Sequence, residues 1–108
     1  MARKVWAMEE LRRRLAPPLA AAGAKRAIIF GSHARGEADE WSDLDLLIVA
    51  DTDLPFLDRF RAFRALYDVY PHSMEILVYT PEEFAQMVMA ENSFIEQVLK
   101  DGLTIHEG

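Results

Sequence analysis

Three short apolar runs alternate with longer amphipathic stretches along this chain. The runs cover residues 26–30, 44–50 and 74–79, and each is shorter than an ordinary helix. Leu44 to Ala50 is almost continuously aliphatic, which is typical of a strand covered on at least one face. The pattern therefore predicts three strands of one small sheet, with helices between and after them that cover it.

Apolar periodicity predicts two of these helices. Apolar residues at helical spacing predict a first helix from about residue 5 to residue 15, with Pro17-Pro18 marking its end or the start of a second segment. An aromatic stripe predicts one helix after Pro55 that faces the core, formed by Phe56, Phe60, Phe63, Tyr67 and Tyr70. So many aromatic rings exceed what a small monomer covers, which hints at an interface and leaves a homo-oligomer open.

Two capping boxes predict the helices of the last third of the chain. Thr80-Pro81-Glu82-Glu83 opens one helix, Ser93-Phe94-Ile95-Glu96 opens the next, and Gly102 suits the position just after a helix end. No repeat, low-complexity tract or linker interrupts the order of elements. We therefore expect a single α+β domain over residues 1–108, with a small mixed β-sheet covered by helices.

The composition excludes several classes of protein. With 51% hydrophobic and 28% charged residues, the chain of 108 residues has ordinary globular composition. It contains no cysteine, which excludes disulfide frameworks, Cys-ligated zinc and thiol nucleophiles. No apolar run reaches membrane-spanning length, and the stretch after the first four residues is amphipathic rather than the apolar core of a signal peptide, so a cytoplasmic protein without membrane contact is expected.

The acidic residues are concentrated. Of a net charge of −6, residues 37–53 contribute seven acids and no base. Asp43 and Asp45 stand two residues apart at the head of the second predicted strand, so their side chains project from one face. Glu75 lies alone among apolar neighbours on the third predicted strand, and it joins them if the two strands pair. Three such carboxylates suit two Mg²⁺ ions, or Mn²⁺, in phosphoryl-type displacement.

A glycine-serine turn precedes these acids. Gly31 follows the first predicted strand, where the absence of a Cβ lets backbone amides approach a phosphate. Ser32 adds a hydroxyl donor, Arg35 offers a planar fork for phosphate, and Gly36 permits the chain to reverse. A nucleoside triphosphate with its Mg²⁺ ions fits between this turn and the acids. The alternative for Arg35 is an ion pair with Glu37 or Asp39.

These motifs resemble a known family. Gly31-Ser32-His33-Ala34-Arg35-Gly36 followed by Ser42-Asp43-Leu44-Asp45-Leu46-Leu47 is similar to the signature of the DNA polymerase β-like nucleotidyltransferases, above all to the minimal nucleotidyltransferases (MNT). The resemblance extends from about Ala27 to Phe84. It implies that Asp43, Asp45 and Glu75 bind the metals, and that Gly31 and Ser32 hold the triphosphate; Arg35 and Ser42 also match the usual pattern. Two positions depart from it: Glu75 stands where Asp is more usual, and His33 where a basic or aromatic residue is.

The resemblance also implies a partner. Minimal nucleotidyltransferases commonly pair with a small helical HEPN protein as the antitoxin of a toxin–antitoxin system, and can adenylylate it. It therefore implies transfer of AMP from ATP to a tyrosine hydroxyl of a HEPN toxin. Two alternatives stay open: an antitoxin that neutralises its partner by occlusion alone, and transfer to a small molecule such as an aminoglycoside, with the site shared across a homodimer.

The remaining polar features have simpler interpretations. We expect His33 and His72 on the surface rather than as ligands, since three scattered histidines form no zinc pattern. Two basic clusters are interpreted as solvated helix faces or contacts to an acidic partner protein: Arg12, Arg13 and Arg14, and Arg59, Arg61 and Arg64. The chain is acidic and lacks a basic-aromatic platform, so direct nucleic-acid binding is not expected.

Overall fold

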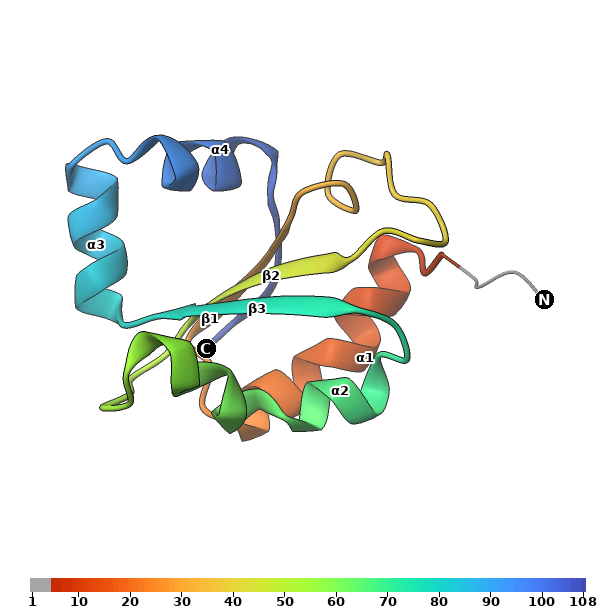
Figure 1. Cartoon of the computed structure of the whole chain (residues 1–108), viewed down its shortest axis with the longest axis horizontal. Helices are drawn as coiled ribbons and strands as arrows, with labels where there is room; N and C mark the ends of the chain where they lie inside the picture. Colours follow the sequence, from red (N-terminus) through yellow and green to blue (C-terminus); the bar gives the residue numbers. More distant parts are fainter. Residues whose placement is uncertain (1–4) are drawn as a thin grey trace.

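A four-stranded sheet forms the centre of the molecule. The computed structural model describes residues 5–108. The strands are β1 (Arg26–Phe30), β2 (Leu44–Val49), β3 (Met74–Tyr79) and β4 (Leu103–Glu107), in the spatial order β3-β2-β1-β4. β1 pairs antiparallel with β2 and with β4, whereas β2 and β3 run parallel (Figure 1). The three predicted strands and the mixed α+β sheet are confirmed; β4 was not predicted.

Helices cover both faces of this sheet. The helix α1 (Met8–Ala21) and the short α2 (Ala65–Val69) lie on one face, where Leu44, Leu46 and Ile48 of β2 point into the larger core. The helices α3 (Pro81–Met89) and α4 (Ser93–Asp101) lie against the other face, where Leu47 and Val49 form a smaller core (Figure 1). No helix in the described range 5–108 has the length and apolar character needed to cross a bilayer.

The first helix continues past the point where its sequence predicts an end. α1 runs to Ala21, with Pro17 and Pro18 inside it. Each proline removes one helical hydrogen bond, which usually ends or kinks a helix. Here Leu11, Leu15 and Leu19 are all completely buried in the core, and this packing spans the proline pair. Tertiary contact therefore overrides the local stop signal.

The aromatic stripe does not lie on one continuous helix. A 3-10 helix, η1 (Phe56–Phe63), comes first, and α2 follows it. Side chains three residues apart eclipse one another in a 3-10 helix, so the four-residue step from Phe56 to Phe60 turns the ring by about a third of a turn around the axis. Phe63 and Tyr70 are buried, whereas three rings of the stripe keep about two fifths of their surface exposed: Phe56, Phe60 and Tyr67. The prediction that the whole stripe is core is wrong.

The helix ends confirm one capping prediction and correct two. Thr80 and Glu83 form the predicted capping box of α3. The cap of α4 is Asn92, not Ser93; its side chain accepts a hydrogen bond from the amide of Ile95 at 3.1 Å. Gly102 ends α4 in an extended conformation rather than a left-handed one, and it lacks room for a Cβ because Val98 O would lie 2.3 Å away.

Arg59 corrects the expectation that its basic cluster is solvated. Its side chain is buried, and its guanidinium donates to the carbonyl oxygens of Leu54 (2.9 Å) and Val78 (3.1 Å). It also forms a bidentate pair with the Glu83 carboxylate, at 2.6 and 3.1 Å. Arg59 thus joins η1 to the end of β3 and the start of α3.

Candidate functional site

Parallel pairing of β2 with β3 brings two of the predicted acidic residues face to face. The register places Asp45 opposite Glu75, and both project to the side of the sheet that carries α3 and α4. The neighbours of Asp45 along β2, Leu44 and Leu46, are completely buried on the opposite face and fix this orientation. Asp43 lies immediately before β2, where the amide of Leu44 donates to the carbonyl of Ser73 at 3.0 Å.

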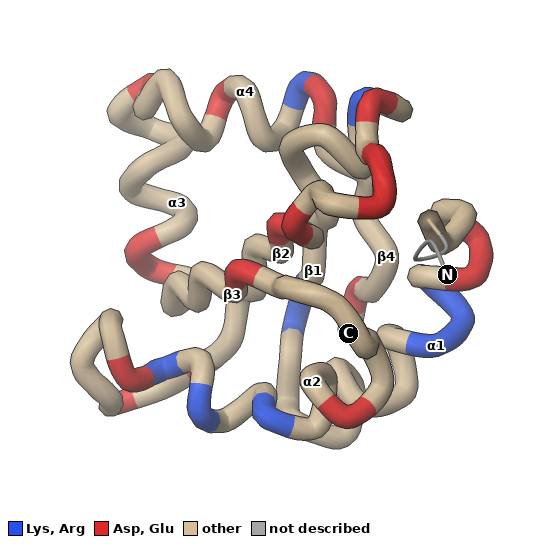
Figure 2. The backbone as a smooth tube through the Cα atoms, turned by 45° about the vertical axis from the view of Figure 1, so that its right-hand side comes forward, with Lys and Arg blue, Asp and Glu red and all other residues tan. Residues whose placement is uncertain are grey.

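The environment of Asp45 shows that the three carboxylates interact. Burial raises the pKa of Asp45, and the negative charges of Glu75 and Asp43 and a hydrogen bond with Glu75 raise it further. Arg35 is close enough to act in the opposite direction. Figure 2 shows the acidic segment at the start of β2 beside the acidic position on β3. The fold therefore assembles the acidic cluster that the sequence places on two separate strands.

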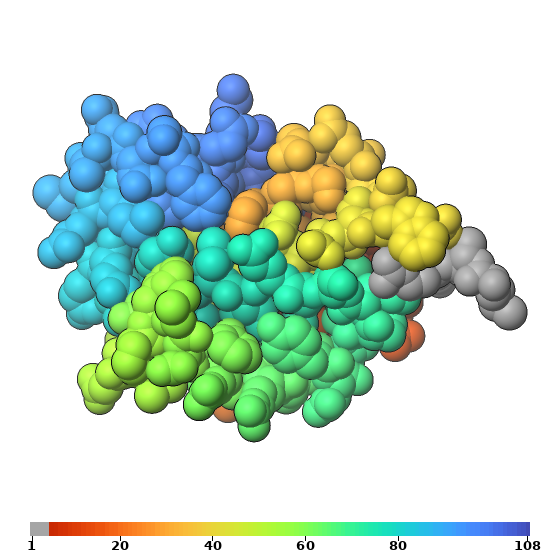
Figure 3. All heavy atoms as spheres, viewed as in Figure 1, coloured from red at the N-terminus to blue at the C-terminus, as the bar shows by residue number. Residues whose placement is uncertain are grey.

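The glycine-serine turn lies directly against this cluster. Gly31 has a φ of +74°, and a Cβ at this position would lie 2.3 Å from Oδ2 of Asp45. The chain then forms a single tight turn, in which the amide of Arg35 donates to the carbonyl of Gly31 at 3.1 Å and the amide of Glu37 to that of Ser32 at 2.9 Å. In the space-filling view, this turn, β3 and α4 meet on one face (Figure 3). Gly31 is thus required both for the turn and for the approach of Asp45.

The donor set of the cluster suits a hard divalent cation. Asp43, Asp45 and Glu75 offer only carboxylate oxygens, the ligands that Mg²⁺ prefers. The space that a Cβ on Gly31 would fill is taken by the Asp45 carboxylate, so the predicted phosphate grip and the predicted metal ligands adjoin. Within residues 5–108, no three acidic or histidine side chains already stand in a metal-binding arrangement. The metal roles of the three residues stay predictions.

Arg35 and Ser42 have partners within the loop that connects β1 and β2. Arg35 pairs with Glu37 at 2.8 Å, which is the simpler of the two interpretations given for it, and this ion pair raises its pKa. The hydroxyl of Ser42 donates a hydrogen bond to the Asp39 carboxylate at 3.0 Å. The same hydroxyl accepts a hydrogen bond from the backbone amide of Asp39 at 2.9 Å. Both residues shape the loop, and their contact with a nucleotide stays a prediction.

His33 is buried, contrary to the expectation that it lies on the surface. Only 9% of the residue is exposed, and burial lowers its pKa although a hydrogen bond to the backbone of Asp43 acts against this. The bond links the turn to the segment that carries the first acid. The Nδ1 atom of the His33 ring is buried without a hydrogen-bond partner. This turn has no apolar periodicity from which the burial of His33 could be predicted.

Comparison with known proteins agrees with this geometry. Residues 8–106 match the family described as "Nucleotidyltransferase domain". Two relatives from Methanocaldococcus jannaschii, both named "Putative protein adenylyltransferase", are 38% identical over 72 residues and 34% identical over 83 residues. The first alignment covers 67% of this chain and 77% of the relative, and the second 76% and 78%.

Solved structures share the fold. A structure described as "putative minimal nucleotidyltransferase" is 31% identical, with a TM-score of 0.64 and coverage of 89% of this chain and 90% of that one. The "toxin-antitoxin with AMP-PNP" crystal structure has the same TM-score at 16% identity, covering 90% of this chain and 73% of that one. The minimal nucleotidyltransferase is similar to this chain in sequence and in fold, whereas the toxin-antitoxin structure is similar in fold alone. This chain belongs to the nucleotidyltransferase domain family and is an enzyme of that class.

Proposed function

We propose that this protein is an Mg²⁺-dependent adenylyltransferase that transfers AMP from ATP to a tyrosine hydroxyl of a HEPN toxin and thereby acts as its antitoxin. The observation that carries the proposal is the pairing of Asp45 with Glu75 directly beside the Gly31 turn. The names of the relatives support protein adenylylation. The fold shared with a toxin–antitoxin structure that holds AMP-PNP supports ATP and a toxin partner.

Each predicted site residue has a role in this reaction. The backbone at Gly31 and the hydroxyl of Ser32 bind the triphosphate, and Arg35 and Ser42 lie on the loop that borders it. Asp43, Asp45 and Glu75 would hold Mg²⁺, which when bound lowers the pKa of the acceptor hydroxyl and offsets charge on the leaving group. A new bond forms between the acceptor oxygen and the α-phosphorus while the bond to the β-phosphate oxygen breaks. Pyrophosphate leaves, and the hydroxyl proton passes to solvent.

The proposal is tested with labelled ATP, Mg²⁺ and the product of the gene adjacent to the one that encodes this chain. Label is expected on that partner, and an exchange of its acceptor tyrosine for Phe is expected to prevent labelling. Asp45→Asn is expected to abolish transfer, by more than about 100-fold, because it removes one carboxylate of the cluster. Its melting temperature is not expected to fall, since the amide relieves repulsion from Glu75 and Asp43. Transfer retained by the purified variant would contradict the mechanism.

The occlusion alternative gives a different result in cells. If the protein neutralises its partner by binding alone, the double variant Asp43→Ala/Asp45→Ala neutralises it as well as the wild type does. The adenylyltransferase proposal requires that this variant binds the partner and fails to neutralise it. Co-purification of the variant with the partner serves as the control for binding.

A further inference from the structure

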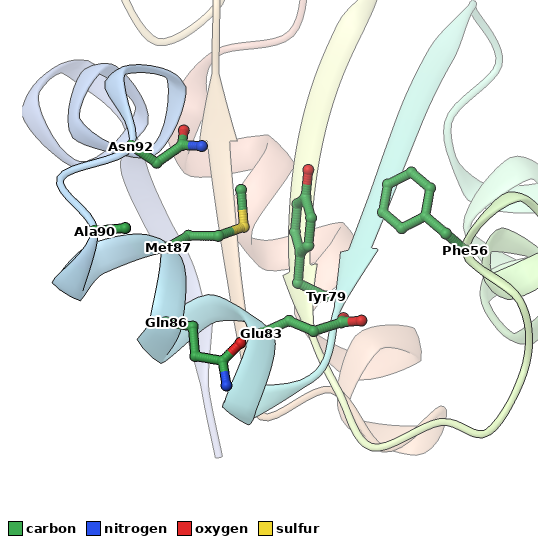
Figure 4. Close-up of a pocket in the computed structure, with 7 residues that line it drawn as sticks. All are labelled: Phe56, Tyr79, Glu83, Gln86, Met87, Ala90 and Asn92. Atoms are coloured by element: carbon green, nitrogen blue, oxygen red, sulfur yellow. The ribbon is translucent and has the colours of Figure 1, made fainter.

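A pocket opens between β3, η1 and α3, at the end of the sheet opposite the Gly31 turn. It has a volume of about 400 Å³, within the range of small-molecule sites, and is lined by Phe56, Tyr79, Glu83, Gln86, Met87, Ala90 and Asn92 (Figure 4). Phe56 belongs to the aromatic stripe and Glu83 to the capping box of α3, but no sequence signal marks the lining residues as one group. This pocket is larger than a pocket of about 250 Å³ beside the Gly31 turn, on the same side of the sheet.

The pocket lies on the same side of the sheet as the acidic cluster. Side chains on a strand alternate between its faces, so Glu75 and Tyr79, four residues apart on β3, project to the same side. Tyr79 packs with the smaller core under α3 and α4, the side to which Asp45 also points. The rise of a strand, about 3.3 Å per residue, separates their Cα atoms by about 13 Å. A ribose and base attached to a phosphate at the carboxylates would extend over this distance.

The walls of the pocket suit a flat, heteroaromatic group. Phe56 lies beside Tyr79, with ring centroids 5.2 Å apart and an angle of 44° between the planes. Figure 4 shows the side chains of Met87 and Asn92 pointing toward the Tyr79 ring from the opposite side. A thioether and an aromatic ring facing one another across a gap are soft, polarisable surfaces for stacking.

The side-chain amide of Asn92 offers a hydrogen-bond donor to the pocket. The Oδ1 atom of Asn92 accepts from the amide of Ile95 as the cap of α4, so its Nδ2 is left to donate to a ligand. Figure 4 shows this nitrogen on the pocket side. The carboxylate of Glu83 is neutralised by the bidentate pair with Arg59 and by the amide of Thr80, so it does not present a free negative charge. Ring nitrogens and carbonyl oxygens of a nucleobase are acceptors that Asn92 could satisfy.

We infer that this pocket holds the base of the nucleoside triphosphate whose phosphates bind at the Gly31 turn, with Tyr79 and Met87 on its two faces and Asn92 donating to its edge. The inference rests on the proposed function and specifies where its nucleotide lies. The second pocket, of about 250 Å³, is lined by Gly31 and Arg35 themselves and therefore belongs to the phosphate end. The nucleotide then spans the acidic cluster, which lies between the two pockets along the sheet.

The test compares binding of ATP with binding of inorganic tripolyphosphate, both with Mg²⁺, by calorimetry. Tyr79→Leu is expected to weaken ATP binding about tenfold, because it removes one stacking surface, and to leave tripolyphosphate binding unchanged. Asn92→Ser keeps a residue suited to cap α4 but removes the amide donor, and a several-fold loss for ATP alone is expected. The matched control is Tyr67→Leu, which removes a half-exposed ring of α2 outside the pocket and is expected to change neither affinity.

The outcomes separate this inference from the proposed function. If Tyr79→Leu and Asn92→Ser both bind ATP as tightly as the wild type, the inference is overturned and the proposed function is unaffected. If these variants bind ATP normally but transfer label to the partner more slowly, the pocket receives the acceptor, which also overturns the inference. If the wild type binds neither ATP nor tripolyphosphate, the proposed function itself fails. Unchanged tripolyphosphate binding by each variant shows that it is folded.

Discussion

Gly31 and Asp45 are neighbours in space although the polar loop separates them in sequence. Gly31 is the first residue of the tight turn after β1, and its positive φ already favours glycine. The same position must also leave room for the Asp45 carboxylate, which lies where a Cβ would be. Glycine at position 31 therefore permits the positive φ and also leaves space for the Asp45 carboxylate. The two requirements can be separated experimentally.

Gly31→Ala is expected to abolish nucleotidyl transfer because the added methyl group displaces the Asp45 carboxylate. Gly23→Ala is the matched control: Gly23 has a φ of +88°, but a Cβ there meets nothing within 4 Å. Both variants should lose about 1–2 kcal/mol of unfolding free energy from the left-handed backbone. Activity assays and denaturant titrations of both would check this. Equal activity of the two variants would show that Gly31 serves the backbone alone.

At the scale of single elements, α1 shows how packing overrides a local signal. Pro17 is exposed and Pro18 half-buried, and neither contributes to the buried leucine stripe that holds the helix on the sheet. Their effect on the helix is therefore a local loss of hydrogen bonds rather than a loss of packing. A proline at the first position of a helix has no such cost, because the amide there needs no helical partner. Pro81 of α3 occupies that position.

Pro17→Ala is accordingly expected to stabilise the protein by about 1–2 kcal/mol, because it restores a backbone donor and a good helix former in the interior of α1. Pro81→Ala serves as the comparison and should leave the stability unchanged or slightly lower. Thermal and denaturant unfolding of both variants measure the difference. A loss of stability in Pro17→Ala would mean that the restriction proline places on the unfolded chain outweighs the restored hydrogen bond.

The junction of η1, β3 and α3 depends on one ion pair. Glu83 accepts from Arg59 and from the amide of Thr80, and these bonds lower its pKa to about 2 from an ordinary value of 4.5. A carboxyl group whose pKa is depressed in the folded state stabilises the fold fully above its ordinary pKa, and this contribution is lost as the pH falls toward the folded value. The Glu83 side chain is 42% exposed to solvent, so salt screens the ion pair in part.

Glu83→Gln should therefore be less stable than the wild type at pH 7, with a difference that shrinks as the pH falls from about 4.5 to about 2. Glu82→Gln, in the same turn of α3 but exposed, is expected to show no comparable pH-dependent difference. Urea denaturation across this pH range provides the measurement. A stability difference for Glu83→Gln that stays constant below pH 4.5 would contradict the assigned role of the pair.

At the scale of the molecule, the last strand forms one edge of the sheet. β4 pairs with β1 on the side away from β2, and Ile105 reaches the larger core with only 4% of its surface exposed. The C-terminal segment thus covers the edge of the strand that leads into the Gly31 turn. Because β1 leads directly into Gly31, the pairing of β4 with β1 also helps to hold the candidate site in position.

Ile105→Ala is expected to cost about 2–4 kcal/mol of unfolding free energy, because it leaves a cavity in the core against β1. Leu103→Ala removes a side chain of the same size from the same strand, but Leu103 is 40% exposed, so a clearly smaller loss is expected. Denaturant unfolding of both variants tests this. Equal losses would indicate that β4 contributes through its backbone pairing rather than through Ile105.

Local patterns were sufficient for the strands β1, β2 and β3, for the capping box of α3 and for the acidic residues of the motifs. Apolar runs of strand length and a Thr–Glu pair three residues apart are signals contained in a few neighbouring residues, so they could be interpreted without the fold. The nucleotidyltransferase resemblance rests on the same kind of short motif, and the family comparison confirms it. The sequence predicted that Glu75 meets Asp45 only on the condition that the second and third strands pair, which the sequence could not establish.

Which strands and side chains meet depends on the packing of distant segments. The strand order β3-β2-β1-β4, the presence of β4 and the continuation of α1 past Pro17 and Pro18 could not be predicted from local patterns. The same holds for which rings of the aromatic stripe are buried and which are exposed. Tertiary packing also buries His33 and Arg59, and it forms the pocket around Tyr79. Each of these depends on contacts between residues far apart in the chain, whose free energy exceeds local propensity and leaves no trace in a short window of sequence. The acidic residues and the glycine turn can be identified from short motifs, whereas their assembly into one site depends on the pairing of β2 with β3 and on the approach of Asp45 to Gly31.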